Sequence, residues 1–192
     1  MKKLNGKYLS TLREINETID STVNFQRISN LVVEKTTFFL GVKGISLFIL
    51  ENGDGELKST VSYGISRKYL SKGPQLTGKR IFDTLGGRTL LISDVATDPC
   101  TPHPEAAKQE GIEFVLSIPL SVNGNIIGFL RIYSPEGYEF TKEIITFVEV
   151  LCQKIALAIE NAFQYESVED KHESVMPDIW MVSPRALNTS SE

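Results

Sequence analysis

The most reactive side chains in the sequence are two cysteines and two histidines. Cys100 and His103 lie close together in an irregular stretch, whereas Cys152 falls in a long apolar helical pattern and His172 in a polar C-terminal segment. A neighbouring imidazolium favours the thiolate and makes a cysteine more nucleophilic. Cys100 and His103 therefore suggest a redox sensor, or a haem ligated by His103. The competing interpretation is an unremarkable, partly exposed thiol and a surface histidine, with Cys152 packed in the core.

Other reactive patterns are missing from the sequence. The two cysteines are far apart and lack metal-ligand spacing, so we expect no disulfide framework, no zinc site and a reducing, cytoplasmic location. No Ser/His/Asp arrangement, phosphate-binding loop or Gly-rich dinucleotide loop is present. Asp94 and Asp98 are better explained as turn residues than as a carboxylate pair. We therefore expect a protein that is not an enzyme.

Composition limits the partners further. The chain has 192 residues, of which 41% are hydrophobic and 23% charged, and a formal net charge of −4, which fits one globular domain with flanking segments. Lysines and arginines are scattered rather than clustered, which argues against nucleic-acid binding. No apolar run reaches the length of a membrane span, and no apolar region follows the N-terminal lysines as in a secretory signal.

Helical patterns lie at both ends of the sequence. Asn24 can cap a helix that ends at Gly41, and Thr141 can cap a long helix that continues to about residue 165. Narrow apolar seams, typical of helices that pack against other helices, run along an N-terminal helix and along the long helix. These seams consist of Tyr8, Leu12, Ile15 and Ile19, and of Ile144, Val148, Leu151, Ile155, Ala158 and Ala162.

Strand patterns fill the middle of the chain. Alternating or continuous apolar runs predict strands at 45–50, 56–63, 89–92, 114–122 and 125–133. Asn123-Gly124 is the strongest hairpin signal, and Pro119 requires a bulge or an outward-facing position. Residues 64–87 and 95–111 are irregular and long enough to form a lid. The order predicts an α+β fold, with helices on one face of an antiparallel sheet and the lid stretches on the other.

Four stretches in this order resemble the GAF domain family. They are SLFILENGDGELKSTVSYGIS at 46–66, LLISDVATDP at 90–99, LSIPLSVNGNIIGFLRIYS at 116–134 and EFTKEIITFVEVLCQKIALAIENA at 139–162. The third is the most specific, with its Pro-Leu, its Asn-Gly hairpin and its Gly-apolar-Leu. The resemblance covers roughly residues 10–165. It assigns 1–165 to one GAF domain, and we expect 166–192 to be a poorly ordered tail.

The resemblance implies a central antiparallel sheet of five or six strands in a GAF/PAS-like arrangement. Terminal helices would pack on one face, and lid loops and short helices would enclose a small-molecule site on the other. GAF domains commonly dimerise through their terminal helices and relay ligand occupancy to an attached output domain. We expect no attached output domain and therefore a stand-alone sensor that forms a homodimer or acts on a signalling partner in trans.

The resemblance does not identify the ligand or any cofactor. Cyclic-nucleotide-binding members resemble a pattern with an Asn-Lys pair and a Phe followed by Asp-Glu, whereas here Phe140 is followed by Thr141 and Lys142. Bilin-binding members attach the chromophore to a lid cysteine that is often followed by His, but Thr101 follows Cys100. Members that reduce methionine sulfoxide use several lid cysteines, and only Cys100 lies in the lid here.

Strand alternation and position in the lid nominate nine residues for the ligand site. The alternative is that several of them fill a collapsed core, as in GAF domains that only dimerise. The nominated residues are Phe48, Tyr63, Tyr69, Phe82, Cys100, His103, Phe114, Leu116 and Arg131.

Overall fold

A computed structural model describes residues 10, 13–17, 24–50, 57–72, 87–98, 101 and 103–175; for 57–60 and 166–175 it describes the backbone alone. The two long helices lie on either side of the strands along the chain, as the sequence predicts. In order the elements are α2 (Phe25–Leu40), β1 (Gly44–Leu50), β2 (Leu57–Tyr63), α3 (Arg67–Ser71), β3 (Leu90–Ile92), α5 (Pro104–Glu110), β4 (Phe114–Val122), β5 (Asn125–Ser134) and α6 (Lys142–Val175).

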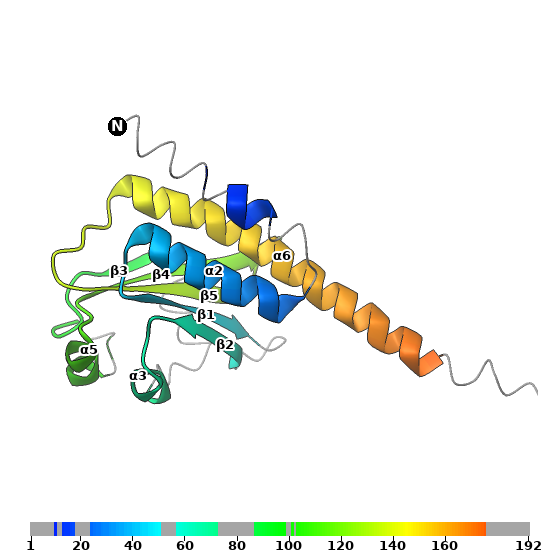
Figure 1. Ribbon diagram of the computed structural model, residues 1–192, viewed down its shortest axis with the longest axis horizontal. Coiled ribbons are helices and arrows are strands. Elements are labelled where there is room, and N and C mark those ends of the chain that lie inside the picture. Colours follow the sequence, from blue (N-terminus) through cyan, green and yellow to red (C-terminus); the bar gives the residue numbers. More distant parts are fainter. Residues whose placement is uncertain are drawn as a thin grey trace, which may run out of the picture.

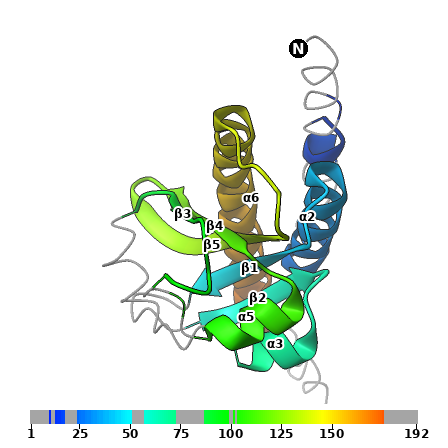
Figure 2. The same ribbon diagram turned by 90° about the vertical axis from the view of Figure 1, so that its left-hand side faces the viewer.

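The five strands form one antiparallel sheet in the order β2-β1-β5-β4-β3 (Figure 1). Helices α2 and α6 cover one face: α2 contacts β1 and β2, α6 contacts β4 and β5, and the two helices contact each other. The short helices α3 and α5 lie on the opposite side of the sheet (Figure 2). The predicted α+β fold, with helices on one face and short helices on the other, is confirmed.

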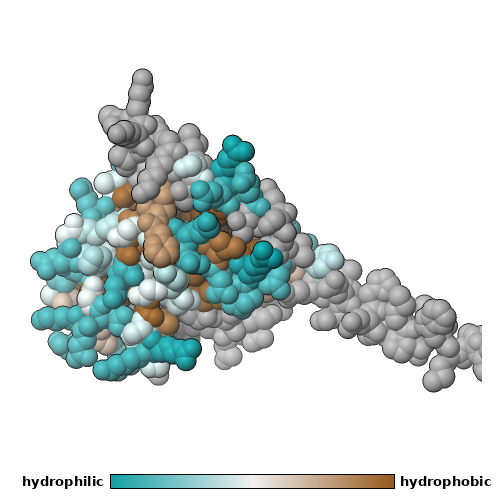
Figure 3. Space-filling model, viewed as in Figure 1, coloured by the Kyte–Doolittle hydropathy of each residue, from teal (hydrophilic) through white to brown (hydrophobic). Residues whose placement is uncertain are grey.

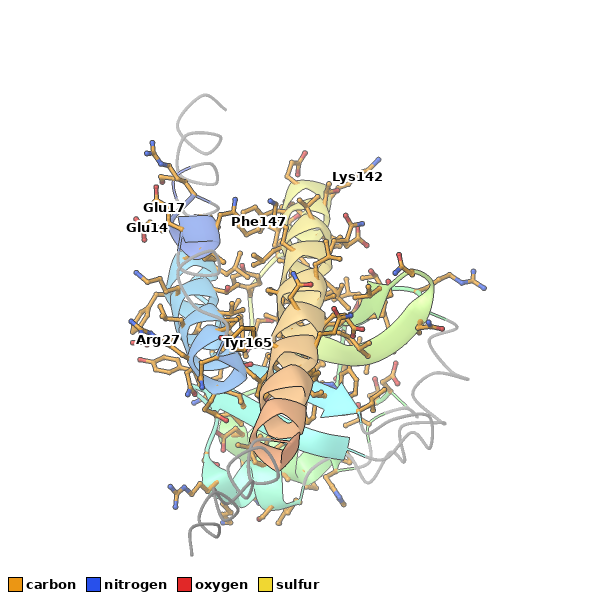
Figure 4. All side chains as sticks on the ribbon, turned by 90° about the vertical axis from the view of Figure 1, so that its right-hand side faces the viewer. Glu14, Glu17, Arg27, Lys142, Phe147 and Tyr165 are labelled. Atoms are coloured by element: carbon orange, nitrogen blue, oxygen red, sulfur yellow. The ribbon has the colours of Figure 1, made fainter. Side chains whose placement is uncertain are left out.

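Both predicted helix caps of α2 are present. The Asn24 side chain accepts a hydrogen bond from the Arg27 amide, and Gly41 adopts a left-handed conformation, with φ 65°, that only glycine takes without strain. Rings from the two long helices then meet at two levels, Phe39 with Phe147 and Phe25 with Phe163, each at 5.1 Å between centroids. Figure 4 shows Phe147 on the side of α6 that faces α2. These contacts fix α2 alongside α6.

The predicted seam of α6 packs inward rather than toward a partner helix. Val148, Leu151 and Ile155 are fully buried in the core between α6 and the sheet. The use of this seam for dimerisation is therefore corrected, because a helix stripe that covers an apolar sheet is not available to a second chain. In the N-terminal seam Ile15 is buried and residues 13–17 are helical, whereas Tyr8, Leu12 and Ile19 lie outside the described residues.

Helix α6 continues past the predicted domain end at residue 165 to Val175. Residues 176–192 lie outside the described residues, so the expected poor order of the tail stays a prediction. No helix among the described residues is both long and apolar enough to cross a bilayer.

The β4–β5 hairpin turns at Asn123-Gly124 with positive φ at both residues, as a two-residue turn of this kind requires. Next to the turn Val122 pairs with Asn125, but beyond a bulge at Leu120/Ser121 the register shifts, so that Ser117 lies opposite Arg131. Pro119 pairs with Phe129 beside this bulge, beyond the three residues of β4 that pair with β3. The register after the bulge decides which side chains share a face.

Candidate functional site

Two differently built faces result from this register. The face toward α2 and α6 carries aliphatic side chains such as Leu47, Ile118 and Leu130. The opposite face, toward α3 and α5, is called the lid face below. Directly paired residues place four side chains in one row across β2, β1, β5 and β4 of the lid face, namely Ser62, Ser46, Arg131 and Ser117. We call these four residues the polar row.

Hydrogen bonds link the polar row in two pairs. The Ser62 hydroxyl donates to the Ser46 hydroxyl at 2.7 Å, and the Nε of Arg131 donates to the Ser117 hydroxyl at 3.2 Å. Ser46 and Ser117 are buried, and Arg131 is partly buried. The row therefore holds a positive charge and hydroxyl groups in a partly desolvated position.

Two aromatic rings support the guanidinium. Phe48 and Phe129 are paired across β1 and β5, and their rings stack at 4.5 Å with an angle of 15° between planes. The guanidinium carbon of Arg131 lies 5.8 Å from the Phe48 centroid and 5.6 Å from the Phe129 centroid. A cation over a ring face is attracted by the ring quadrupole. These contacts offset part of the cost of removing Arg131 from water.

Two tyrosines flank the other side of the row. Tyr133 is fully buried, and Tyr69 from α3 meets its ring edge-on at 5.9 Å. Burial raises the pKa of Tyr133 above its ordinary value, although the positive charge of Arg131 and hydrogen bonds of the phenol with Ser46 and Arg131 act in the opposite direction. Burial raises the pKa of Tyr69 to about 12 as well. Both phenols are therefore neutral at physiological pH, so neither of them balances the charge of Arg131.

No acidic side chain pairs with Arg131 within the described part of the chain. The ion pairs found there join Arg13 to Glu17 and Lys35 to Glu14, both far from the lid face. Glu110, the acidic residue whose charge reaches Tyr69, accepts hydrogen bonds from the amide and the hydroxyl of Ser66 instead.

The Ser66–Glu110 contact joins the two lid helices. Ser66 also caps α3 by accepting from the Tyr69 amide, so one residue holds both the start of α3 and the end of α5. Burial would raise the pKa of Glu110, but the hydrogen bonds from Ser66 outweigh it and hold the pKa below its ordinary value. The position of Tyr69 over the lid face therefore depends on this clamp.

The nine nominated residues divide into four groups. Phe48, Tyr69 and Arg131 come together on the lid face. His103 is exposed just before α5, and its side chain makes no capping hydrogen bond. Phe82 and Cys100 lie outside the described residues.

Tyr63, Phe114 and Leu116 form the fourth group and lie on the other face of the sheet. Leu116 is fully buried in the core under α6, and Tyr63 and Phe114 pack against that core. Their predicted placement beside the lid is therefore corrected. The physical reason is that β1, β4 and β5 are apolar on both faces. Alternation along a strand therefore does not tell whether its odd-numbered or its even-numbered residues face the lid.

Sequence reasoning overlooked most of the polar row and its neighbours. Ser46, Ser62, Ser117, Phe129 and Tyr133 were not nominated, although Phe129 and Tyr133 share the parity of Arg131 on β5. That shared parity was the available signal.

Two other sequence interpretations are settled by side-chain positions. Asp94 holds a turn, because its carboxylate accepts from the Ala96 amide and the Thr97 hydroxyl, as predicted. Cys152 is buried in the core, as predicted, and burial raises the pKa of its thiol. Within the described residues, no group of His, Cys, Asp or Glu side chains is arranged to hold a metal ion.

The sequence model of the GAF domain matches residues 24–159, which include every strand of the sheet. The chain belongs to the GAF domain family. No curated protein matches the chain in a sequence comparison.

Solved structures, GAF domains among them, share the fold. The GAF domain of a phosphoenolpyruvate-protein phosphotransferase from Coxiella burnetii is 24% identical with a TM-score of 0.70, and the match covers 84% of this chain and 97% of that one. A free methionine-R-sulfoxide reductase from Neisseria meningitidis, in complex with its substrate, has 15% identity and a TM-score of 0.62, covering 82% and 91%. A phycoerythrobilin-bound GAF domain from a cyanobacterial phytochrome has 14% identity and a TM-score of 0.61, covering 83% and 97%. At these identities the likeness establishes the fold alone.

Proposed function

We propose that this GAF domain is a regulatory module, not an enzyme, that binds a small molecule on the lid face and passes its occupancy to a second copy of the chain through α2 and α6. The observation that carries the proposal is the polar row. A ligand bound there would contact strands β1, β4 and β5 directly and α3 through Tyr69. Because α2 and α6 pack on the other side of the same strands, the sheet would link ligand binding on the lid face to the association of two copies through these helices.

The polar row has no role in packing that would account for it. The neighbours of the polar row by one residue along each strand point to the helix-covered face and are all aliphatic: Leu47 beside Ser46, Leu130 beside Arg131 and Ile118 beside Ser117. Burying polar and charged groups costs free energy unless they find partners, so a face that only packs is better filled with apolar residues. The charge of Arg131 on this face is better explained by a ligand that carries the opposite charge, since no acidic side chain of the described residues pairs with it.

Two of the structural neighbours lend support by analogy. One was solved with phycoerythrobilin bound and another with its substrate, so this fold accommodates small molecules in those proteins.

Coupling to a second copy draws support from exposed apolar side chains on the two long helices. Phe38 on α2 is 65% exposed, and Val150 and Leu157 on α6 are 41% and 53% exposed. The face that carries α2 and α6 displays hydrophobic residues among polar ones (Figure 3). The same observation favours the second candidate function, a dimerisation scaffold that binds no ligand. The third candidate, a redox or haem sensor at Cys100 and His103, has only the exposure of His103 in its favour.

A thermal-shift screen with a metabolite library tests the ligand part of the proposal. A compound that binds the native state alone raises the melting temperature, by an amount that grows with its concentration. We expect at least one such compound, and we expect Ser62→Val, which places a methyl-bearing side chain in the polar row, to reduce the shift. Ser121→Val is the matched control, since Ser121 is an exposed serine of β4. An empty screen contradicts ligand binding and leaves the scaffold.

Light scattering tests the coupling. We expect a dimer whose dissociation constant changes on addition of the stabilising compound, and Leu157→Asp should weaken it. A strict monomer at high concentration, with and without the compound, contradicts the proposed coupling to a second copy of the chain.

The cytoplasmic location expected from the sequence stays a prediction.

A further inference from the structure

We propose that the ligand of the lid face carries a carboxylate and that Arg131 binds it. This inference rests on the proposed function and narrows it to a ligand class. The row contains one cation and three hydroxyl groups, and each of its members comes from a different strand.

The guanidinium has donors to spare. It carries five N–H groups in a planar fork, of which the Nε–H is directed to Ser117 and a further one is shared with the Tyr133 phenol. The bond to Ser117 fixes the plane of the fork, and the stacked rings of Phe48 and Phe129 support it. Its terminal N–H groups then match the two oxygens of a carboxylate, the bidentate geometry in which arginine binds most strongly.

The hydroxyl groups of the polar row are already linked to one another. Ser62 donates to the Ser46 oxygen at 2.7 Å, and the Ser46 side chain is in turn hydrogen-bonded to the Tyr133 phenol. Ser46 pairs with Arg131 across β1 and β5. The guanidinium is therefore the member of the row that we expect to bind the ligand.

Charge selects a carboxylate over a phosphate. Arg131 is the one charged member of the polar row, and no acid of the described residues neutralises it. The neighbouring phenols of Tyr69 and Tyr133 stay protonated, because burial raises the pKa of each. One positive charge and neutral hydroxyls balance a monoanion, whereas a phosphate dianion would remain uncompensated in a partly desolvated position.

The inference is tested with benzoate, its neutral isostere benzamide, and inorganic phosphate, measured by ligand-observed NMR on the whole chain. Benzoate should bind at least about tenfold more tightly than benzamide or phosphate, the usual worth of a charge-assisted hydrogen bond. Arg131→Gln should abolish that preference. Arg131→Lys keeps the positive charge but lacks the planar fork of N–H groups, and it should retain part of the preference for benzoate. Arg27→Gln, a change at an exposed residue of α2, should behave like the wild type.

Each contrary result has a distinct meaning. Equal binding of benzoate and benzamide, tighter binding of phosphate, no binding of benzoate, or unchanged benzoate binding in a folded Arg131→Gln variant overturns the carboxylate assignment. If Arg131→Gln does not fold, equal affinity in Arg131→Lys and the wild type overturns the bidentate contact. The proposed function fails separately, when no compound of the metabolite screen, acidic or neutral, stabilises the wild type.

Discussion

Gly64 links strand β2 to helix α3, and replacing it by alanine should disturb the lid more than its exposed position suggests. Its φ is +77°, a conformation that is strained for any residue with a β-carbon. A β-carbon there would also overlap the backbone carbonyl oxygen of Lys43, which cannot move without shifting the start of β1. The Gly64→Ala variant therefore combines backbone strain with a steric clash.

Gly137→Ala provides the matched control. Gly137 has the same φ of +77°, but an added β-carbon would meet no atom within 4 Å. Left-handed strain costs about 1–2 kcal/mol, and the loss of freedom in the unfolded chain offsets about 0.4–1 kcal/mol of it. Forcing an extra methyl group into a packed position adds about 1–3 kcal/mol. We therefore expect Gly64→Ala to lower the free energy of unfolding by about 1–3 kcal/mol more than Gly137→Ala.

Urea denaturation followed by circular dichroism measures both variants on the same scale. Near-ultraviolet spectra should also change more in Gly64→Ala, because Tyr69 and Tyr133 lie downstream of the displaced turn. Equal destabilisation by the two substitutions would show that the close approach to Lys43 has no effect on stability, contrary to this prediction.

Three further predictions concern the core and the lid clamp. Leu151→Ala should lower the free energy of unfolding by about 2–5 kcal/mol, measured by urea titration, because Leu151 is fully buried. Leu157 is 53% exposed, so Leu157→Ala should change the free energy of unfolding of the monomer by less than about 0.5 kcal/mol. In a Cys100→Ser variant the remaining thiol, Cys152, should react with a thiol reagent only at the rate of unfolding, and fast labelling of the native protein would contradict its burial. The pKa of Glu110 in the folded protein lies below its ordinary value of 4.5, so its hydrogen bonds with Ser66 should stabilise the fold above about that pH and be lost as the pH falls through the folded pKa. Glu110→Gln should therefore be less stable than the wild type at pH 7 and equally stable in acid. A difference in stability that does not depend on pH would contradict the role of the Glu110 carboxylate.

Much of the fold could be predicted from local patterns. Caps at Asn24 and Gly41, the Asn123-Gly124 turn and the two-sided apolar strands each act within a few residues, and each is found where the sequence places it. These features, together with the family motifs, were enough for the α+β arrangement and the antiparallel sheet.

The lid face could not be predicted in the same way, because it depends on register across strands. Counting back from the Asn123-Gly124 turn would place Ser117 opposite Leu130, whereas the bulge at Leu120/Ser121 shifts it opposite Arg131. A shift of one residue exchanges the two faces of a strand. This is why Arg131 and Phe48 were nominated correctly for the lid face, while Leu116 and Phe114 were assigned to the wrong one.

Helix faces posed the same difficulty. The apolar stripe of α6 could serve a partner helix or the sheet, and its periodicity is the same in both cases. Only the contact with β4 and β5 shows that Val148, Leu151 and Ile155 belong to the core, which leaves Val150 and Leu157 at the surface.

A small molecule bound on the lid face would bring its protons close to the side chains of that face. An isotope-filtered NOE spectrum of the chain with a stabilising compound from the metabolite screen detects such contacts. We expect NOEs from the compound to the Tyr69 ring and to the side chain of Arg131. NOEs to Tyr63, Phe114 or Leu116, or to α2 and α6, would contradict binding on the lid face.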